Sequence, residues 1–280
     1  MSDHYEWLMH PLNIEYLDRP QPIDKTPFQK VWVIDNYLPP PIWFSWRDWR
    51  GQSTNWGRSN RVIRDGEVQH LYWGESIYIN KGERGFDNTP QCEIHYENYH
   101  QYYTDWKKQS SWKKDTLSLK HIGYRNAVID WFIHKLRQDF RFDWEYFQYC
   151  GFNGQTYGQH GTIHEDTGLD DACIHNLTFL YYDQARWEDD WGGDLIMYNG
   201  EYHNHREHKG IPEDAEDYEI GRVQYKPNRL VIMNGAITHR HPGPSAEYTK
   251  ENGFPYRTSM VVRGCLLYTS DAADEEDSVD

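Results

Sequence analysis

The chain has 280 residues, a net charge of −15 and 38% hydrophobic residues, and 16% of it is aromatic, with 13 Trp and 22 Tyr. Large aromatic side chains bury much area each, so a core can form despite the polar average, and disorder over the whole length is excluded. Such an acidic chain lacks the general basic face that displaces counterions from phosphate, so nucleic acid is not expected as a partner.

The sequence shows no signal for secretion, for membrane insertion or for a disulfide framework. The N-terminus has no basic region followed by an apolar run, and no stretch approaches the ~20 apolar residues of a membrane helix. The four cysteines are scattered without a CxxC pair, which fits a reducing compartment and argues against a cysteine-based zinc site. We therefore expect a cytoplasmic protein, in the host cytoplasm if its source is a phage, with no membrane partner.

The N-terminal half mixes one clear strand with less regular segments. Residues 29–38 are rich in β-branched and aromatic residues and predict a strand, which the prolines from Pro39 onward end. An aromatic segment, IWFSWRDW, follows. Residues 51–90 are rich in Gly, Asn, Arg and Asp and favour loops and short strands, while 93–120 has a weak helical pattern.

The clearest predicted helix covers residues 124–140. Its apolar residues fall on one face at spacings of three and four, as an amphipathic helix requires: Ile129, Phe132, Ile133, Leu136 and Phe140. Beyond it the pattern changes to short β-branched or aromatic segments separated by Gly, Pro and Asn, at 142–150, 176–182, 194–198, 229–233 and 257–263. This order predicts a mainly β protein with N-terminal helices, in which the short strands form an antiparallel sandwich or barrel.

A histidine and an aspartate two residues apart are the first candidate site. In NGQTYGQHGTIHED, His164 and Asp166 point to the same side of an extended chain and can occupy two adjacent positions of a metal ion. A third ligand from a distant strand would complete a 2-His-1-carboxylate triad, which leaves positions open for a co-substrate and O₂ on iron(II). The HxD spacing alone is weak, because it arises often by chance among 15 histidines.

The elements that follow HED strengthen this interpretation. They are a strand (NLTFLYY), a WGGD turn, a second strand (LIMY), PNRLVIMNGAITHRHPGPS and YRTSMVVRG. This run, from Asn153 to Gly264, resembles the iron(II)/2-oxoglutarate oxygenase superfamily, and most of all its prolyl-4-hydroxylase-like branch. In that branch HxD is followed by a GGE-like turn, a distal His, and an Arg or Lys with a nearby Ser. The segment VIDNYLPP also resembles the opening strand of the branch, and the GGD turn departs from GGE at a residue that is not a metal ligand there.

Two histidines compete for the distal ligand position. The strand RLVIMN and the following turn deliver His239 first. The resemblance points the same way, because the family's usual spacing from the distal His to an Ala-Pro-Ser/Thr or Gly-Pro-Ser turn fits His239 better than His241. The alternative for either residue is a loop histidine that binds only backbone. The predicted metal ligands, which are also the catalytic residues, are therefore His164, Asp166 and His239, with His241 left open as a replacement for His239.

Three further residues are candidates for binding 2-oxoglutarate. Arg257 and Ser259 are two apart in a predicted strand and face the same side, and a guanidinium fork matches a carboxylate. By resemblance this pair would hold the distal carboxylate of 2-oxoglutarate; without the resemblance, Arg257 would as readily form a surface salt bridge. Tyr157 is a third candidate donor, for which a buried core tyrosine is the alternative.

The resemblance implies a double-stranded β-helix, of the jelly-roll or cupin type, that hydroxylates an unidentified substrate. The implied cofactors are Fe(II), 2-oxoglutarate and O₂, with ascorbate as a further candidate. The substrate would be a prolyl or other peptidyl residue, with a small molecule as the alternative. Two rival functions stay open: a cupin-type metal enzyme that does not use 2-oxoglutarate, and a non-catalytic jelly-roll binding or virion structural protein.

One domain is expected over residues 1–264, with an N-terminal layer at about 1–141 and the β-helix core at about 142–264. Residues 265–280 differ, because CLLYTSDAADE matches the translation of a sequencing-library adaptor and six of these residues are acidic. We expect a non-native tail there, and an environmental or phage source would fit it; an acidic disordered tail is the alternative.

Overall fold

The computed structural model describes residues 11–23, 29–51, 57–64, 67–79, 124–141, 144–159, 161, 163–166, 176–199, 215–246 and 257–266. Within these ranges the chain is mostly β, with two α-helices, α1 (Pro40–Gly51) and α4 (Tyr124–Phe140), and two single turns of 3₁₀-helix. No helix of the described part is both long and apolar enough to cross a membrane. The predicted mainly β class is confirmed.

Eight strands form one large sheet. In spatial order they are β1 (Asn13–Tyr16), β2 (Lys30–Ile34), β9 (Arg229–Asn234), β6 (Asn176–Tyr182), β11 (Arg257–Leu266), β5 (Trp144–Gln155), β4 (Glu67–Ile79) and β3 (Gly57–Arg64). Every pairing is antiparallel except that of β1 with β2. A second sheet has three strands, in the order β10 (His239–Arg240), β7 (Leu195–Tyr198) and β8 (Glu219–Val223).

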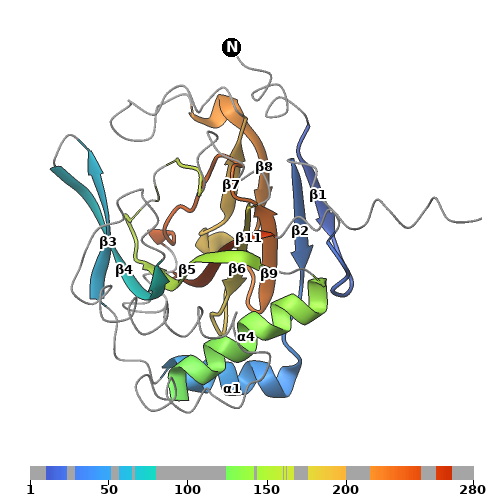
Figure 1. The fold of residues 1–280 in the computed structure, drawn as a ribbon. Helices are drawn as coiled ribbons and strands as arrows, with labels where there is room; N and C mark the ends of the chain where they lie inside the picture. The colour runs from blue at the N-terminus through green and yellow to red at the C-terminus, as the bar shows by residue number, and fades with distance from the viewer. Residues whose placement is uncertain are drawn as a thin grey trace, which may run out of the picture.

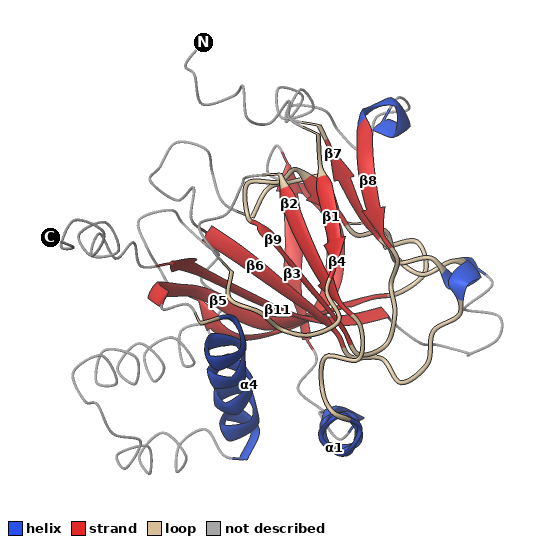
Figure 2. Cartoon of the chain, turned by 90° about the vertical axis from the view of Figure 1, so that its right-hand side faces the viewer, coloured by secondary structure: helices blue, strands red, loops and turns tan. Residues whose placement is uncertain are grey.

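The central strands of the large sheet are apolar on both faces because both faces are covered. In β9, Leu230 and Ile232 pack with the helices, while Val231 and Met233 pack against the small sheet. Alternate residues of each strand point to opposite faces, so one strand serves two cores. Figure 2 shows the resulting layers, with the helices on one side of the large sheet and β7 and β8 on the other.

The helix layer is fixed by one buried face of α4. Phe132, Leu136 and Phe140 follow one another at a spacing of four and are fully buried. The ring of Trp46 from α1 lies 5.1 Å from that of Phe132, so both helices share this core (Figure 1). The prediction of a helix over 124–140 is confirmed.

Several boundaries differ from the sequence predictions. The strand predicted at 142–150 runs on to Gln155, and residues 67–79 form one long strand where short strands and loops were expected. The weakly helical 93–120 lies outside the described residues. At the other end, β11 continues past Gly264 to Leu266, and residues 267–280 lie outside the described part.

Candidate metal centre

Two histidines face each other across an isolated β-bridge. The backbone N–H of His164 donates to the carbonyl of His239 at 2.9 Å, and that of His239 donates back at 2.8 Å. Residues paired in this way carry their side chains on the same face, and the two ring centroids are 4.6 Å apart. The segment after β5 is thereby held against β10, and ligand candidates 75 positions apart in the sequence meet.

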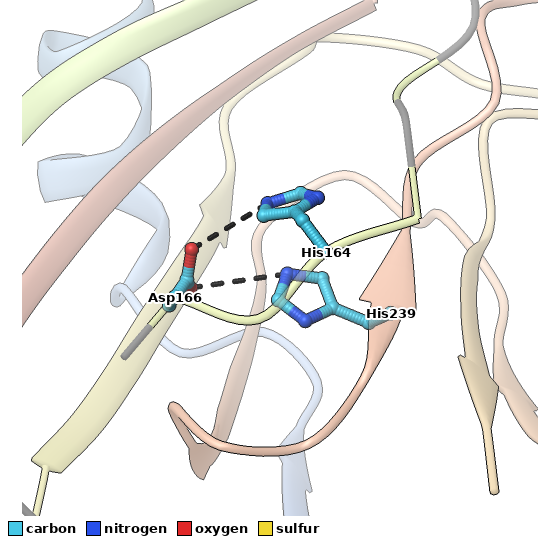
Figure 3. Close-up of side chains that lie close together, drawn as sticks. All are labelled: His164, Asp166 and His239. Atoms are coloured by element: carbon cyan, nitrogen blue, oxygen red, sulfur yellow. Dashed lines mark ion pairs between the residues drawn. The ribbon is translucent and has the colours of Figure 1, made fainter. Parts of the chain in front are cut away.

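Asp166 joins this pair from the next position on the same side. Its backbone N–H donates to the carbonyl of Gly235 at 2.8 Å. Its carboxylate lies 3.6 Å from Nε2 of His164 and 3.8 Å from Nε2 of His239, as Figure 3 shows. One ligand atom from each of the three residues lies within 4.8 Å of the others. A single ion could contact all three.

The carboxylate of Asp166 is oriented by two further side chains. Thr178 Oγ1 donates a hydrogen bond of 2.7 Å to Oδ2, and Arg263 forms an ion pair of 2.7 Å with Oδ1. Thr178 lies on β6 and Arg263 on β11, which are neighbours in the large sheet. Both carboxylate oxygens of Asp166 therefore have a partner inside the protein. Such partners are needed because the side chain is only 2% exposed and meets little water. Neither partner was predicted from the sequence.

The charges of this cluster are those that a divalent metal needs. Burial alone raises the pKa of Asp166, but the Arg263 cation and the two histidines outweigh it and hold that pKa far below its usual value. Burial lowers the pKa of His239 to about 4, against the opposing effect of Asp166. At neutral pH the folded chain thus presents an ionised carboxylate and a neutral imidazole.

The hydrogen bond of His239 also fixes which nitrogen is free. Nδ1 lies 2.8 Å from the carbonyl oxygen of Ile237. A carbonyl only accepts hydrogen bonds, so Nδ1 carries the proton and Nε2 keeps its lone pair. Since Nε2 faces Asp166, His239 offers its ligating atom on the side where the other two candidates lie. Such a bond from the second nitrogen is how metal-binding histidines are usually oriented.

A second polar cluster is centred on Arg257, which is 1% exposed. Its guanidinium donates to the carbonyl of Gly193 at 2.7 Å, to Gln155 Oε1 at 3.2 Å and to Ser259 Oγ at 3.5 Å. The fourth bond is to Nδ1 of His241 at 2.9 Å. The predicted pair of Arg257 and Ser259 therefore lies together, buried between the two sheets, and the surface salt bridge considered for Arg257 is wrong.

Two tyrosines pack against this guanidinium. The carbon at its centre lies 5.2 Å from the ring centroid of Tyr182 and 4.7 Å from that of Tyr225. Tyr225 Oη donates to the carbonyl of Thr258, whereas Tyr182 Oη is buried beside Arg257, which can donate to it, and has no acceptor for its own hydrogen among the described residues. Burial raises the pKa of Tyr182 to about 12, against the opposing effect of Arg257, so this hydroxyl remains a donor. No local pattern in the sequence singles out Tyr182.

The structure separates the two candidates for the distal histidine. His239 lies with His164 and Asp166, whereas His241, whose ring centroid is 5.9 Å from that of His239, bonds to Arg257. Burial, and then the Arg257 cation, lower the pKa of His241 well below its usual value. Tyr157 lies in the turn after β5 and is 58% exposed, which excludes the core tyrosine considered for it.

Comparisons with known proteins gave structural likenesses only. No family model and no curated protein matches the chain. The solved structures that match include a prolyl-4-hydroxylase from Pseudomonas putida, a prolyl hydroxylase from Trichoplax adhaerens in complex with a hypoxia inducible factor peptide fragment, and a 2OG-Fe(II) oxygenase family oxidoreductase from Burkholderia pseudomallei.

In that order their sequence identities are 16, 14 and 11%, and their TM-scores are 0.42, 0.41 and 0.39. The matches cover 85, 84 and 84% of this chain and 92, 83 and 84% of the other chains. At such TM-scores these likenesses assign no function. A proposal about function therefore has to rest on the residues of the two clusters.

Proposed function

We propose that this chain is an iron(II)- and 2-oxoglutarate-dependent oxygenase that hydroxylates its substrate. In this proposal the large and small sheets are the two faces of a double-stranded β-helix. The observation that carries the proposal is the placement of two clusters. The triad His164, Asp166 and His239 lies next to a buried cationic cluster around Arg257, and His241 touches both.

The donor set of the triad fits iron(II). Two imidazoles and one carboxylate suit a divalent ion of intermediate softness, and a facial set of three leaves positions for other ligands. The donor atoms come from the segment after β5 and from β10, which the reciprocal backbone bonds of His164 and His239 join. Thr178 and Arg263 keep Asp166 in place, so the set is preorganised.

The cluster around Arg257 fits the distal carboxylate of a dicarboxylic acid. A guanidinium has five N–H donors, and that of Arg257 makes four hydrogen bonds, one of them to Ser259 at a long 3.5 Å. The hydroxyl hydrogen of Tyr182, which has no acceptor among the described residues, is a further donor beside this guanidinium.

Each part has one role in the proposed reaction. Bound iron(II) and 2-oxoglutarate supply the oxidising chemistry, in which O₂ gives one oxygen atom to the substrate and the other to succinate, with loss of CO₂. His164, Asp166 and His239 would hold the metal. Arg257 and Tyr182, which are both buried, would orient the co-substrate, and the Arg257 cation would offset its charge. Because Asp166 fills the third protein ligand position, hydroxylation is expected rather than halogenation.

The proposed substrate follows from the sequence resemblance and not from a contact in the structure. A prolyl or other peptidyl residue comes first, and a small metabolite is the alternative. The two rival functions differ in what they need from the chain. A cupin-type enzyme that does not use 2-oxoglutarate has no use for the donors around Arg257, and a structural jelly-roll protein has no use for the triad.

Two substitutions separate the roles of the clusters. In the anaerobic protein, Asp166→Ala should abolish iron(II) binding and therefore the binding of 2-oxoglutarate to the metal. Arg257→Lys keeps the charge but loses the planar fork, so iron(II) should bind as in the wild type while 2-oxoglutarate binds about tenfold more weakly or worse. Calorimetry with the metal and then with the co-substrate measures both. Equal affinity of Arg257→Lys and wild type for 2-oxoglutarate would contradict the proposed role of Arg257.

A further inference from the structure

The carboxylate of Asp166 is held by one neutral and one charged donor. Thr178 and Arg263 are direct cross-strand partners on β6 and β11, so their side chains lie on the same face of the large sheet. Thr178 Oγ1 lies 2.7 Å from Oδ2, and a terminal nitrogen of Arg263 lies 2.7 Å from Oδ1. The two donors orient the same group, but only Arg263 brings a positive charge to it.

Arg263 points into the space between the two sheets. Val261, two residues earlier on β11, packs in the core between the large and the small sheet, whereas Val262 packs with the helices. Because side chains alternate along a strand, Arg263 lies on the face of Val261. The side chain of Arg263 is 19% exposed and that of Asp166 is 2% exposed, so little water screens this ion pair.

The ion pair leaves the carboxylate of Asp166 able to bind a metal. An ionised carboxylate has about four lone-pair positions, and Thr178 and Arg263 each take one. A metal at the triad would therefore share this ligand with the Arg263 cation. Two cations on one carboxylate repel each other, and the repulsion grows with the charge of the metal. A trivalent ion is thus disfavoured more than a divalent one.

We infer that the charge of Arg263 biases the triad toward divalent metals, so that bound iron is held in its reduced, ferrous state. This inference rests on the proposed function and assigns Arg263 as a positioning residue that acts on the metal through Asp166. The equilibrium concerned is the gain of one electron by ferric iron to give ferrous iron, and mediator dyes supply that electron in the test. Arg263 thereby favours the form of iron that the proposed reaction uses.

Four substitutions separate the charge of Arg263 from its hydrogen bond. Arg263→Lys keeps the charge and loses the planar fork, and Arg263→Gln keeps an N–H donor and loses the charge. Arg263→Met loses both and retains an unbranched side chain. Thr178→Val is the matched control, because it removes a neutral donor from the same carboxylate.

Two measurements compare the charge states of the metal without 2-oxoglutarate or substrate. The first is the midpoint potential of bound iron, from an anaerobic titration with mediator dyes. The second uses ions that do not change oxidation state, zinc(II) and gallium(III), whose affinities for the metal-free protein are measured by competition against a chelator.

We expect both neutral variants, Arg263→Gln and Arg263→Met, to raise the affinity for the trivalent ion relative to the divalent one by about tenfold. For iron, a tenfold change lowers the midpoint potential by about 59 mV, since one electron is transferred. Arg263→Lys and Thr178→Val should keep the wild-type ratio, even where their affinities for both ions fall together. If Arg263→Gln does not fold, Arg263→Met makes the same comparison.

A wild-type ratio in the neutral variants overturns the inference. So does a ratio in Arg263→Lys that changes as much as in Arg263→Gln, which would assign Arg263 a purely geometric role. The proposed function fails in a different way, since a wild-type chain that binds neither iron nor zinc at the triad would contradict it, and the inference with it. Because 2-oxoglutarate is absent from both measurements, a failure of the Arg257 cluster to bind it leaves their result unchanged.

Discussion

His164 and His239 are joined by two reciprocal backbone hydrogen bonds, and this bridge, not their side chains, brings the candidate ligands together. The side chains differ in burial, with 40% of that of His164 exposed against 2% of that of His239. A ligand set held by the main chain can lose a side chain without losing its geometry. This separation of metal binding from folding can be measured.

His164→Ala should abolish metal binding and leave the free energy of unfolding of the metal-free protein within about 0.5 kcal/mol of wild type, because the side chain is partly exposed. Asp166→Ala should abolish metal binding and also cost about 1–3 kcal/mol, since Thr178 and Arg263 lose their buried acceptor. Metal titration and urea unfolding test both variants. Equal stabilities for the two would show that the contacts of Asp166 do not support the fold.

Thr178→Val should weaken metal binding about 10–100-fold with little change of shape, because it removes only the hydroxyl that orients Asp166. Thr178→Ser is the matched control, since it retains the donor, and it should bind the metal within a few-fold of wild type. Competition against a chelator of known affinity measures both variants. A Val variant with the affinity of the Ser variant would exclude the orienting role.

Gly193→Ala should disturb Arg257. A Cβ at this position would lie 2.8 Å from Cδ of Arg257 and 3.1 Å from the Trp187 ring, and the backbone φ is +82°. Gly192→Ala is the control, because its φ of +71° is similarly strained while its nearest contact would be an ordinary 3.6 Å. Each should lose about 1–3 kcal/mol of stability through strain.

Of these two glycine variants, only Gly193→Ala should also weaken the binding of 2-oxoglutarate, as measured by calorimetry on the anaerobic iron(II) protein. A loss of equal size in Gly192→Ala would trace the effect to the turn and not to Arg257.

Much of the fold follows from local patterns. The helix at 124–140 has a clean apolar stripe, so its periodicity is informative. The strands at 176–182 and 229–234 are covered on both faces and form nearly continuous apolar runs, so their length is informative. Helix α1 was not predicted, because Pro40 was interpreted as a strand end although proline also suits the first turn of a helix. The long β4 was missed because residues 51–90 were judged together by their Gly, Asn, Arg and Asp content, which hides the β-branched and aromatic residues of 67–79 that pair with β3 and β5.

The site was predictable only where its residues stand close in sequence. His164 with Asp166 and Arg257 with Ser259 are each two positions apart, so strand geometry alone relates them. Thr178 and Arg263 contact Asp166 through the register of β6 and β11, which no local pattern determines. The choice between His239 and His241 depended in the same way on the two-residue strand β10, which is too short to show periodicity.

The metal-free protein should lose stability as the pH falls from about 6.5 toward 4. Burial lowers the pKa of His239 to about 4 in the folded chain, whereas an unfolded histidine takes up a proton near 6.5. In this window the unfolded state binds more protons, so acidification favours unfolding, by on the order of 3 kcal/mol for complete protonation. Asp166, whose folded pKa is also depressed, adds the same trend below its usual value.

His239→Gln should reduce this pH dependence, because the substituted side chain does not titrate. The part that remains comes from Asp166 and from His241, whose pKa burial also lowers. Urea unfolding in the presence of a chelator, at half-unit steps of pH, compares the variant with the wild type. Parallel profiles would mean that His239 is not the group that couples protons to folding.

The central claim is that the triad and the Arg257 cluster serve one reaction. The most direct measurement is succinate formed per bound iron when O₂ is admitted to the anaerobic protein with iron(II), 2-oxoglutarate and ascorbate. Succinate should form only when iron, 2-oxoglutarate and O₂ are all present, and His239→Ala should form none. A wild-type chain that binds one iron and leaves 2-oxoglutarate unchanged, with a panel of peptides present, would contradict the account.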